Sequence, residues 1–267
     1  MNIGKAEQAE LISVAHELAD VARVETLKYF RQPALSVANK EQTSFDPVTE
    51  ADRASERAMR DILAKRRPND GILGEEYGTS AGTSGLTWVL DPIDGTRAYI
   101  SGTASWGVLI GLDAGDGPVF GIVDQPFTAE RFIGGFGLSE WQRGAEKRAM
   151  KTRNCATLSE TILYTTFPEI GTPAEGAAFK AVSQQCKLTR YGLDCYGYAL
   201  IGLGMIDLVI ESGLLAYDVQ GPIAVVEAAG GIVTNWQGGP AHNGGQVIAA
   251  GDARVHAAAL EILNQTV

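Results

Sequence analysis

The sequence predicts an α+β protein whose helices and sheets are stacked in five layers, α/β/α/β/α. Two helical patterns open the chain and are followed by short strand-like runs, whereas beyond about residue 150 helical and strand patterns alternate. Because each helix and sheet must bury an apolar face against another layer, this order favours a layered sandwich. At 267 residues we expect two subdomains, an α+β one at 1–150 and an α/β one at 151–267.

Two helices are expected near the N-terminus. Apolar residues such as Leu11, Val14 and Leu18 recur at helical spacing, which predicts a helix over about 5–30. The polar, weakly patterned segment 35–45 predicts a mobile loop. Thr49-Glu50-Ala51-Asp52 then has the pattern of a capping box, which opens a second helix reaching about residue 65.

Strands and helices after this point are separated by Gly, Pro and Asp clusters. In the first half, strands are expected at 71–74, 87–90, 105–112, 119–123 and 131–134. In the second half, helices are expected at 174–185, 195–204, 218–229 and 252–264, and strands at 187–190, 206–211, 231–235 and 246–250.

Composition argues against several classes of protein. The 22 basic and 32 acidic residues give a net charge of −10, and the densest basic cluster, Lys65-Arg66-Arg67, ends a predicted helix, so no nucleic-acid partner is expected. Three cysteines without C-x-x-C spacing predict reduced, mostly buried thiols. The first 20 residues do not have the pattern of a signal peptide, and the most apolar stretch, 196–210, is too interrupted to span a bilayer. We expect a soluble cytoplasmic protein with no membrane partner.

Acidic residues recur at the ends of predicted strands and at a helix start. Glu75 ends one strand, Asp91 and Asp94 end another, and Asp218 opens a helix. Buried carboxylates are costly unless a cation lies against them, and Mg²⁺ takes oxygen ligands. The pattern therefore predicts a cluster of divalent cations, although each acid alone could be a helix cap or a turn former.

The run Asp91-Pro-Ile-Asp-Gly-Thr96 predicts a turn that brings acidic side chains and free amides together. We expect Pro92 to stop the strand, so that Asp91 and Asp94 turn toward a common point. Gly95 permits close approach of the backbone, and Thr96 opens a short helix. The free amides at that helix start would hold a phosphate beside the metals.

Several segments, taken together and in order, resemble the inositol monophosphatase family of metal-dependent phosphomonoesterases. They cover most of the chain and are Asp46-Pro-Val-Thr-Glu-Ala-Asp52, Gly74-Glu-Glu76, Trp88-Val-Leu-Asp-Pro-Ile-Asp-Gly-Thr96, Tyr217-Asp218 and Glu227-Ala-Ala-Gly-Gly231. The resemblance implies the layered fold described above, a small-molecule phosphomonoester as substrate and a homodimer. It also implies two or three Mg²⁺ ions at each site.

Metal ligands follow from the resemblance, position by position. Glu75, Asp91 and the main-chain carbonyl of Ile93 would hold one Mg²⁺. Asp91, Asp94 and Asp218 would hold a second, and Glu75 would help with a weaker third. The metal-binding motifs then belong to the N-terminal subdomain, with Asp218 supplied by the C-terminal one.

Catalytic roles are implied in the same way. Gly95 and Thr96 would receive the phosphate through backbone amides, and Asp52 and Thr96 would orient the attacking water, with Glu75 aiding as a base. Asp94 and Asp218 are also expected to contact the substrate. Tyr217 and Gln220 depart from the commonest family residues, Trp and Ala, but neither is an expected ligand.

Substrate-recognition residues are expected in the C-terminal subdomain. An Asp followed by aromatic residues, in Tyr191-Gly-Leu-Asp-Cys-Tyr-Gly-Tyr198, resembles the branch of the family that hydrolyses histidinol phosphate. Glu211, seven residues before Asp218, matches the family position that touches the leaving alcohol. Asp194 could instead be, or also be, the N-cap of the following helix. Arg97-Ala98-Tyr99 departs from the pattern of inositol phosphatases, yet an inositol monophosphatase or a broad sugar or polyol phosphatase stays the alternative.

Other functions are less well supported. Gly78-Thr-Ser-Ala-Gly82 matches the G-x-S-x-G motif of serine hydrolases, but a nucleophile elbow needs an apolar strand before it and a helix after it. The histidines His16, His242 and His256 are expected at the surface rather than in catalysis. Some relatives partner RNA polymerase as well as acting as hydrolases, but the complete ligand set favours catalysis here.

Overall fold

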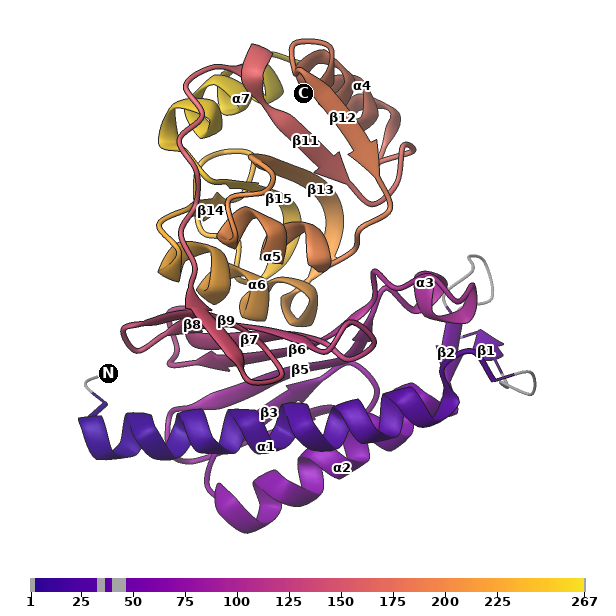
Figure 1. Ribbon diagram of the computed structural model, residues 1–267, viewed down its shortest axis with the longest axis vertical. Helices are drawn as coiled ribbons and strands as arrows, with labels where there is room; N and C mark the ends of the chain where they lie inside the picture. Colours follow the sequence, from indigo (N-terminus) through magenta and orange to yellow (C-terminus); the bar gives the residue numbers. More distant parts are fainter. Residues whose placement is uncertain (1–2, 33–36, 40–46, 267) are drawn as a thin grey trace.

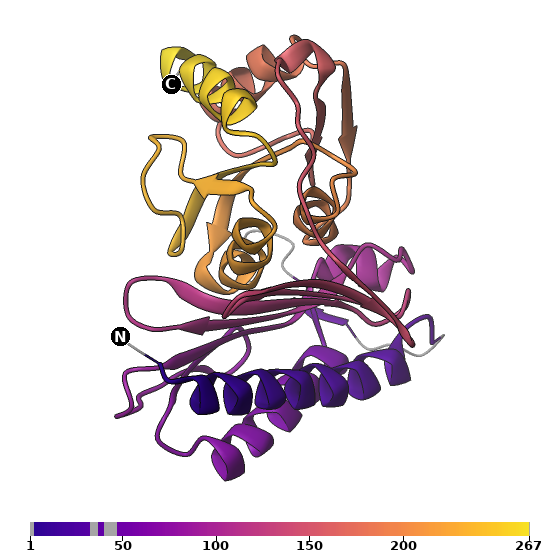
Figure 2. The same ribbon diagram turned by 60° about the vertical axis from the view of Figure 1, so that its left-hand side comes forward.

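The computed structural model describes residues 3–32, 37–39 and 47–266, and it has the predicted five layers (Figures 1 and 2). Two helices form the first layer, an eight-stranded sheet the second, two helices the third, a five-stranded sheet the fourth and two helices the fifth. In layer order the helices are α1 Lys5–Tyr29 and α2 Glu50–Arg66, then α5 Tyr196–Gly202 and α6 Ala216–Ala228, then α4 Pro173–Ser183 and α7 Ala253–Thr266. The α+β layered prediction is confirmed.

The larger sheet contains all strands between residues 71 and 149. Its order is β10-β9-β8-β7-β6-β5-β3-β4, and neighbouring strands are antiparallel except β3 and β5. The strands are β3 Gly71–Gly74, β4 Gly78–Ser80, β5 Thr87–Asp94, β6 Gly107–Asp113, β7 Pro118–Gln125, β8 Glu130–Gly135, β9 Leu138–Arg143 and β10 Glu146–Ala149. We did not predict β4, β9 and β10, because β4 and β10 are exposed and β9 is largely polar, so none has the apolar signature of a buried strand.

The smaller sheet has the order β12-β11-β13-β15-β14. Its strands are β11 Ile162–Thr165, β12 Leu188–Tyr191, β13 Leu208–Leu215, β14 Ile232–Thr234 and β15 Gly244–Ala250, of which β11, preceded by a short 3-10 helix, was not predicted. The strands β1 Val37–Asn39 and β2 Pro47–Thr49 pair separately, and the rest of the predicted loop 35–45 lies outside the described residues. The division into subdomains at residue 150 stays a prediction.

Helix α2 begins with the predicted capping box. The Thr49 hydroxyl accepts a hydrogen bond from the amide of Ala51, and the Thr49 amide donates to Oδ2 of Asp52 at 2.8 Å. These bonds satisfy amides that the first turn of a helix would otherwise leave unpaired. Among the described residues, every helix is either too short or too polar to cross a lipid bilayer.

Strand β5 corrects one expectation, because Pro92 does not stop it. The strand continues to Asp94, but its pairing with β6 is irregular between Asp91 and Asp94. A proline has no amide to donate, so it is tolerated where the hydrogen-bond ladder is already interrupted. The irregularity, rather than the end of the strand, is therefore what turns both aspartates.

Helix α6 lies very close to the larger sheet, and this brings Asp218 to the end of β5. A Cβ atom on Gly121 of β7 would lie 2.6 Å from the carbonyl oxygen of Gly221 in α6. The close approach therefore requires glycine at position 121. Asp218 stands in the first turn of this helix.

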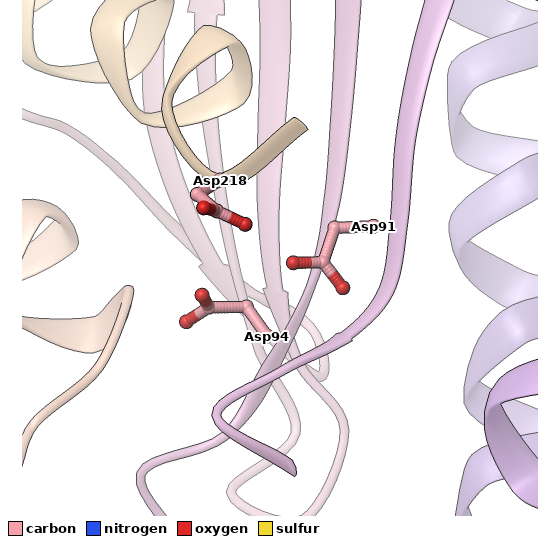
Figure 3. Close-up of side chains that lie close together, drawn as sticks. All are labelled: Asp91, Asp94 and Asp218. Carbon is pink, nitrogen blue, oxygen red and sulfur yellow. The ribbon is translucent and has the colours of Figure 1, made fainter. Parts of the chain in front are cut away.

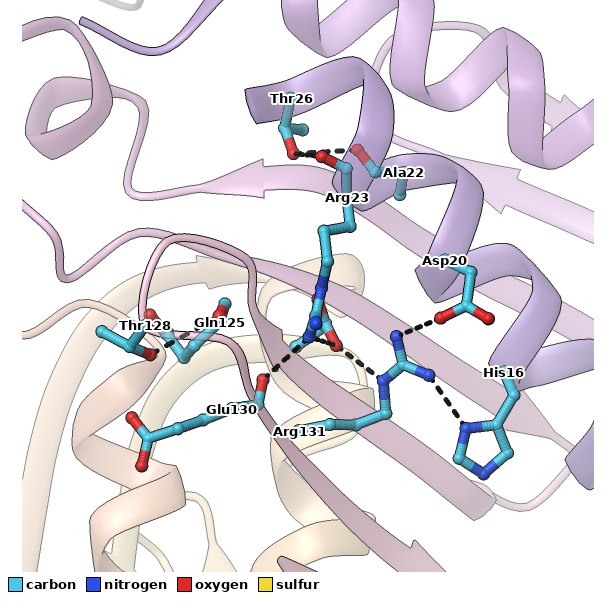
Figure 4. Close-up of polar contacts among 10 residues, drawn as sticks. His16, Asp20, Ala22, Arg23, Thr26, Gln125, Thr128, Glu130 and Arg131 are labelled. Carbon is cyan, nitrogen blue, oxygen red and sulfur yellow. Dashed lines mark hydrogen bonds and ion pairs between the residues drawn. The ribbon is translucent and has the colours of Figure 1, made fainter. Parts of the chain in front are cut away.

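A buried ion cluster joins α1 to β7 and β8 (Figure 4). Asp124 has a fully buried side chain, which accepts hydrogen bonds from Arg23 at 2.7 Å and from Arg131 at 2.6 Å. Arg131 also donates to the exposed Asp20 and contacts His16. The cluster fixes the part of β7 that leads to Gln125.

We expect Asp124→Asn to lower the free energy of unfolding by about 3 kcal/mol, because it leaves the buried Arg131 and the half-buried Arg23 without their shared anion. Urea unfolding monitored by circular dichroism measures the change. The matched control is Asp20→Asn, which also removes a carboxylate from Arg131 but whose side chain is 71% exposed, so its effect should stay within about 1 kcal/mol. Equal effects of the two variants would contradict the importance of burial in this cluster.

Candidate active site

A cavity of about 430 Å³ lies where the end of β5, the start of α5 and the start of α6 meet. Seven of the predicted site residues line it, and they come from both halves of the chain: Glu75, Asp94, Gly95, Thr96, Asp194, Glu211 and Asp218. Asp91 is buried next to the cavity wall, and its pKa responds to the charges of Glu75 and Asp94. The predicted residues are therefore neighbours in space.

Three aspartates form a compact acidic cluster in this cavity (Figure 3). One carboxylate oxygen from each of Asp91, Asp94 and Asp218 lies within 4.8 Å of the others. Burial, together with the negative charges of Glu75 and the other two aspartates, raises the pKa of Asp91 well above its ordinary value. Burial and the charges of Asp194 and Asp218 do the same to Asp94. Such a cluster is unfavourable unless protons or a cation neutralise it.

Each of the three carboxylates is oriented by a main-chain amide. Asp91 accepts from the amide of Ile93 at 3.0 Å, Asp94 from that of Cys195 at 2.6 Å, and Asp218 from that of Leu215 at 2.6 Å. Preoriented carboxylate oxygens are the ligands that Mg²⁺ prefers. The residues present therefore fit a divalent metal ion. Glu75 is a further acidic residue beside these three aspartates, because its amide donates to the carbonyl of Leu90, the residue before Asp91.

Gly95 and Thr96 form a sharp turn out of β5. Gly95 has φ 81°, a left-handed conformation that favours glycine, and Thr96 begins the short helix α3 Thr96–Ile100, as predicted. The Thr96 hydroxyl donates to the carbonyl oxygen of Ile93 at 3.1 Å. Thr96 therefore supports the backbone atom that the resemblance assigns to a metal.

Asp52 uses only one of its carboxylate oxygens in the cap of α2. Its other oxygen, Oδ1, is buried and has no hydrogen-bond partner among the described residues. Burial and the charges of Glu75 and Glu76 raise the pKa of Asp52 to about 7, against the hydrogen bonds from Thr49. An unpartnered oxygen beside Glu75 fits a residue that accepts a hydrogen bond from water. Among the described residues, Asp52 is hydrogen-bonded to Thr49 and the Thr96 hydroxyl to Ile93 rather than to each other, so their shared role stays a prediction.

Asp194 is not a helix cap, which corrects the alternative that the sequence left open. Helix α5 begins after Cys195 and has no side-chain cap, and the Asp194 side chain instead accepts a hydrogen bond from the hydroxyl of Ser105 at 2.7 Å. Asp194 has a left-handed backbone, with φ 49°. This conformation is more accessible to Asp than to most residues.

Glu211 lies in the same cavity and is held from one side. Its Oε1 accepts from the amide of Thr166 at 2.9 Å and from the hydroxyl of Thr166 at 2.6 Å. Burial raises the pKa of Glu211 to about 7, although the Thr166 hydrogen bonds oppose this shift. Burial likewise raises the pKa of Asp194.

Three residues in or next to the cavity were not identified as site residues from the sequence. Thr166 lines the cavity and holds the Glu211 carboxylate, whereas Ser105 holds the Asp194 carboxylate without lining the cavity itself. Tyr198 also lines the cavity, and its buried hydroxyl has no hydrogen-bond partner in the described part of the chain. Arg97 stacks over the exposed Phe167, 4.9 Å from the ring centroid. No local pattern could have found Ser105, since 89 residues separate it from Asp194.

The competing sequence motifs do not form sites. Ser80 lies on the exposed strand β4, where its hydroxyl accepts from Arg60, and no helix follows it. The prediction that all histidines are at the surface is wrong for His256, which is buried and hydrogen-bonded to Thr234 at 2.8 Å. Of the free cysteines, Cys155 and Cys195 are buried and Cys186 is half-buried, as predicted.

A layered α/β/α/β/α fold around this acidic cavity defines a phosphatase. The chain belongs to the inositol monophosphatase family, whose sequence pattern it matches over residues 7–267.

Three relatives show the range within this family. IMPL2, a chloroplastic bifunctional phosphatase of Arabidopsis thaliana, is 38% identical over 98% of this chain and 77% of its own length. A histidinol-phosphatase of Streptomyces coelicolor is 32% identical over 95% of this chain and 97% of its own. The solved structure of an inositol monophosphatase from Zymomonas mobilis has a TM-score of 0.83 and 42% identity, and covers 95% of this chain and 97% of that one.

Proposed function

We propose that this protein is a Mg²⁺-dependent histidinol-phosphatase, which hydrolyses L-histidinol phosphate to L-histidinol and inorganic phosphate in histidine biosynthesis. The observation that carries this proposal is the pair of carboxylates Asp194 and Glu211. Both line the cavity beside the three-aspartate cluster, and neither forms an ion pair with a Lys or Arg of the described residues. They are placed to receive a cationic leaving group.

Electrostatics favours a cationic substrate at these two residues. Burial disfavours the ionised form of both carboxylates, as the raised pKa values of Asp194 and Glu211 indicate. A ligand that carries positive charge restores the ionised form and gains charge-assisted hydrogen bonds. Histidinol carries an ammonium group and an imidazole with a pKa near 6.5, whereas an inositol ring offers only hydroxyls. The Streptomyces relative, a histidinol-phosphatase, supports the same assignment.

The phosphate half of the site is assigned to the acidic cluster and the α3 turn. Glu75, Asp91 and the carbonyl of Ile93 would hold one Mg²⁺, and Asp91, Asp94 and Asp218 a second, with Glu75 near a third. When bound at these residues, Mg²⁺ would supply charge neutralisation for the phosphate oxygens and would lower the pKa of the attacking water.

The chain itself supplies the positioning of substrate and water. The amides of Gly95 and Thr96 receive the phosphate, because they stand at the turn where β5 leads into α3. Asp52 orients the attacking water by accepting a hydrogen bond from it through its unpartnered oxygen, and Thr96 orients the same water. Glu75 aids as a base, and Asp94 and Asp218 also border the substrate.

A second candidate is an inositol monophosphatase or a broad sugar or polyol phosphatase. The Zymomonas structure, an inositol monophosphatase at 42% identity, favours it. Initial rates of phosphate release with Mg²⁺ from L-histidinol phosphate and from inositol monophosphate separate the two. We expect a clear preference for L-histidinol phosphate, because a polyol would leave buried carboxylates without charged partners. Equal kcat/KM values would favour the second candidate.

Asp194→Asn is expected to lower kcat/KM for L-histidinol phosphate by about tenfold more than for p-nitrophenyl phosphate, on the scale of one charged hydrogen bond. The amide keeps the size of the carboxylate but not its charge. The control is Asp116→Asn, an isosteric change in the exposed turn between β6 and β7, which should alter neither value. An equal loss on both esters would mean that Asp194 serves the phosphate half of the site instead.

A further inference from the structure

The Asp194 carboxylate is held in place from outside its own segment. Ser105, buried in the loop between α3 and β6, donates its hydroxyl proton to Oδ2 of Asp194 at 2.7 Å. This is the one hydrogen bond to the Asp194 side chain within the described ranges, so Oδ1 accepts none from them. One carboxylate oxygen is therefore occupied by the protein, and the other is available in the cavity wall.

Asp194 lies close to two residues at the end of β5, Gly95 and Asp94. A Cβ atom on Gly95 would lie 2.6 Å from Asp194 Cγ, so the carboxylate lies directly over the turn between β5 and α3. Asp94, whose own carboxylate holds the amide of Cys195, is a like-charged neighbour of Asp194. Like charges repel at this range. Without a donor on the far side, Asp194 would swing away from the turn.

Ser105 is itself fixed by the core of the larger sheet. Gln125, at the end of β7, donates through Nε2 to the Ser105 carbonyl at 3.4 Å and contacts Sγ of Cys195 at 3.6 Å. Gln125 directly follows Asp124, the centre of the buried ion cluster shown in Figure 4. A continuous series of contacts therefore runs from that cluster to Asp194.

We propose that Ser105 is a positioning residue for substrate selectivity, which holds Oδ2 of Asp194 so that Oδ1 faces the ammonium group of the leaving alcohol. This inference rests on the proposed function, since it presumes that Asp194 meets a cationic leaving group. It adds a residue from the N-terminal half of the chain to the recognition of the alcohol. Loss of the Ser105 hydroxyl lets the Asp194 carboxylate reorient. This weakens binding of the ammonium group of the substrate but leaves binding of the phosphate unchanged.

The test compares L-histidinol phosphate with its desamino analogue, 3-(imidazol-4-yl)propyl phosphate. The analogue has a hydrogen atom in place of the ammonium group and is otherwise the same. The readout is the ratio of kcat/KM for the two esters, with KM and kcat determined separately. We expect Ser105→Ala to lower this ratio about tenfold, mainly through KM, and Ser105→Thr, which keeps the hydroxyl, to restore most of it. Ser139→Ala is the matched control, because it removes a hydroxyl that donates to the Met150 carbonyl, and neither residue lines the cavity.

A double variant tests whether Ser105 acts through Asp194. If it does, Asp194→Asn with Ser105→Ala loses no more of the ratio than Asp194→Asn alone, because coupled residues are not additive. Independent, multiplying losses would overturn the inference, and so would an unchanged ratio in a Ser105→Ala variant whose thermal unfolding matches wild type. A ratio near one in the wild type would instead sink the proposed recognition of the ammonium, whatever Ser105 does.

Discussion

Asp91→Asn is expected to reduce turnover by at least about a thousandfold, the largest effect of any single substitution in this site. Asp91 is the carboxylate assigned to both of the main metal positions, and bound cations contribute several kcal/mol of charge stabilisation to phosphoryl transfer. Its side chain is buried and held by the amide of Ile93, so it is oriented before a metal binds. Phosphate release under saturating Mg²⁺ measures the loss.

The same substitution should have the opposite effect on stability without metal. Neutralising Asp91 removes one negative charge from a buried cluster in which Glu75, Asp94 and Asp218 oppose its ionisation. We therefore expect the metal-free variant to melt at a higher temperature than the metal-free wild type. In the wild type, Mg²⁺ at about 100 times its Kd should add roughly 2.7 kcal/mol, a gain that the variant largely loses.

Two outcomes would contradict the assignment of metals to Asp91. One is wild-type activity that survives exhaustive chelation, and the other is a full Mg²⁺-induced rise in melting temperature in Asp91→Asn. Asp116→Asn, with the same charge change at an exposed position, should behave as wild type in both measurements.

Thr96→Ala is expected to lower kcat by about a hundredfold while leaving the Mg²⁺-induced rise in melting temperature intact. The proposed task of the hydroxyl is to orient the attacking water, and misplacing a reacting group by about 1 Å can cost on the order of a hundredfold. Thr96→Ser keeps the hydroxyl and should retain most of the activity.

The structure makes the Thr96 experiment decisive, because this hydroxyl also donates to the carbonyl of Ile93. If Thr96 acted mainly through that carbonyl, the alanine variant would bind Mg²⁺ more weakly. A titration of the melting temperature against Mg²⁺ distinguishes the two roles. Weakened binding would move Thr96 from water positioning to support of a metal ligand.

Much of the fold could be predicted from local patterns. Helix α1 follows from apolar residues at helical spacing, and α2 follows from the capping box at Thr49. These signals are local because hydrogen bonds within a helix join residues four apart. The strands β4, β9 and β10 were missed for the same reason, since exposed or polar strands owe their pairing to neighbours elsewhere in the chain.

The acids of the site could also be identified along the chain, because carboxylates at the ends of buried strands are costly without a cation. Their exact grouping depends on tertiary structure. Asp218 reaches Asp91 and Asp94 only because α6 lies close to the larger sheet, over glycines such as Gly121. Pro92 is tolerated within β5 because the pairing with β6 is irregular there.

The way in which the Asp194 and Glu211 carboxylates are held is visible only in three dimensions. The resemblance to the family pointed to Asp194 and Glu211, but not to Ser105 and Thr166, which hold the two carboxylates across 89 and 45 residues of chain. Hydrogen bonds of this kind depend on which loops the packed layers bring together, and no periodicity records that. The acidic residues of the site can therefore be identified from local sequence. The direction in which each carboxylate points is decided by how the two halves of the chain pack together.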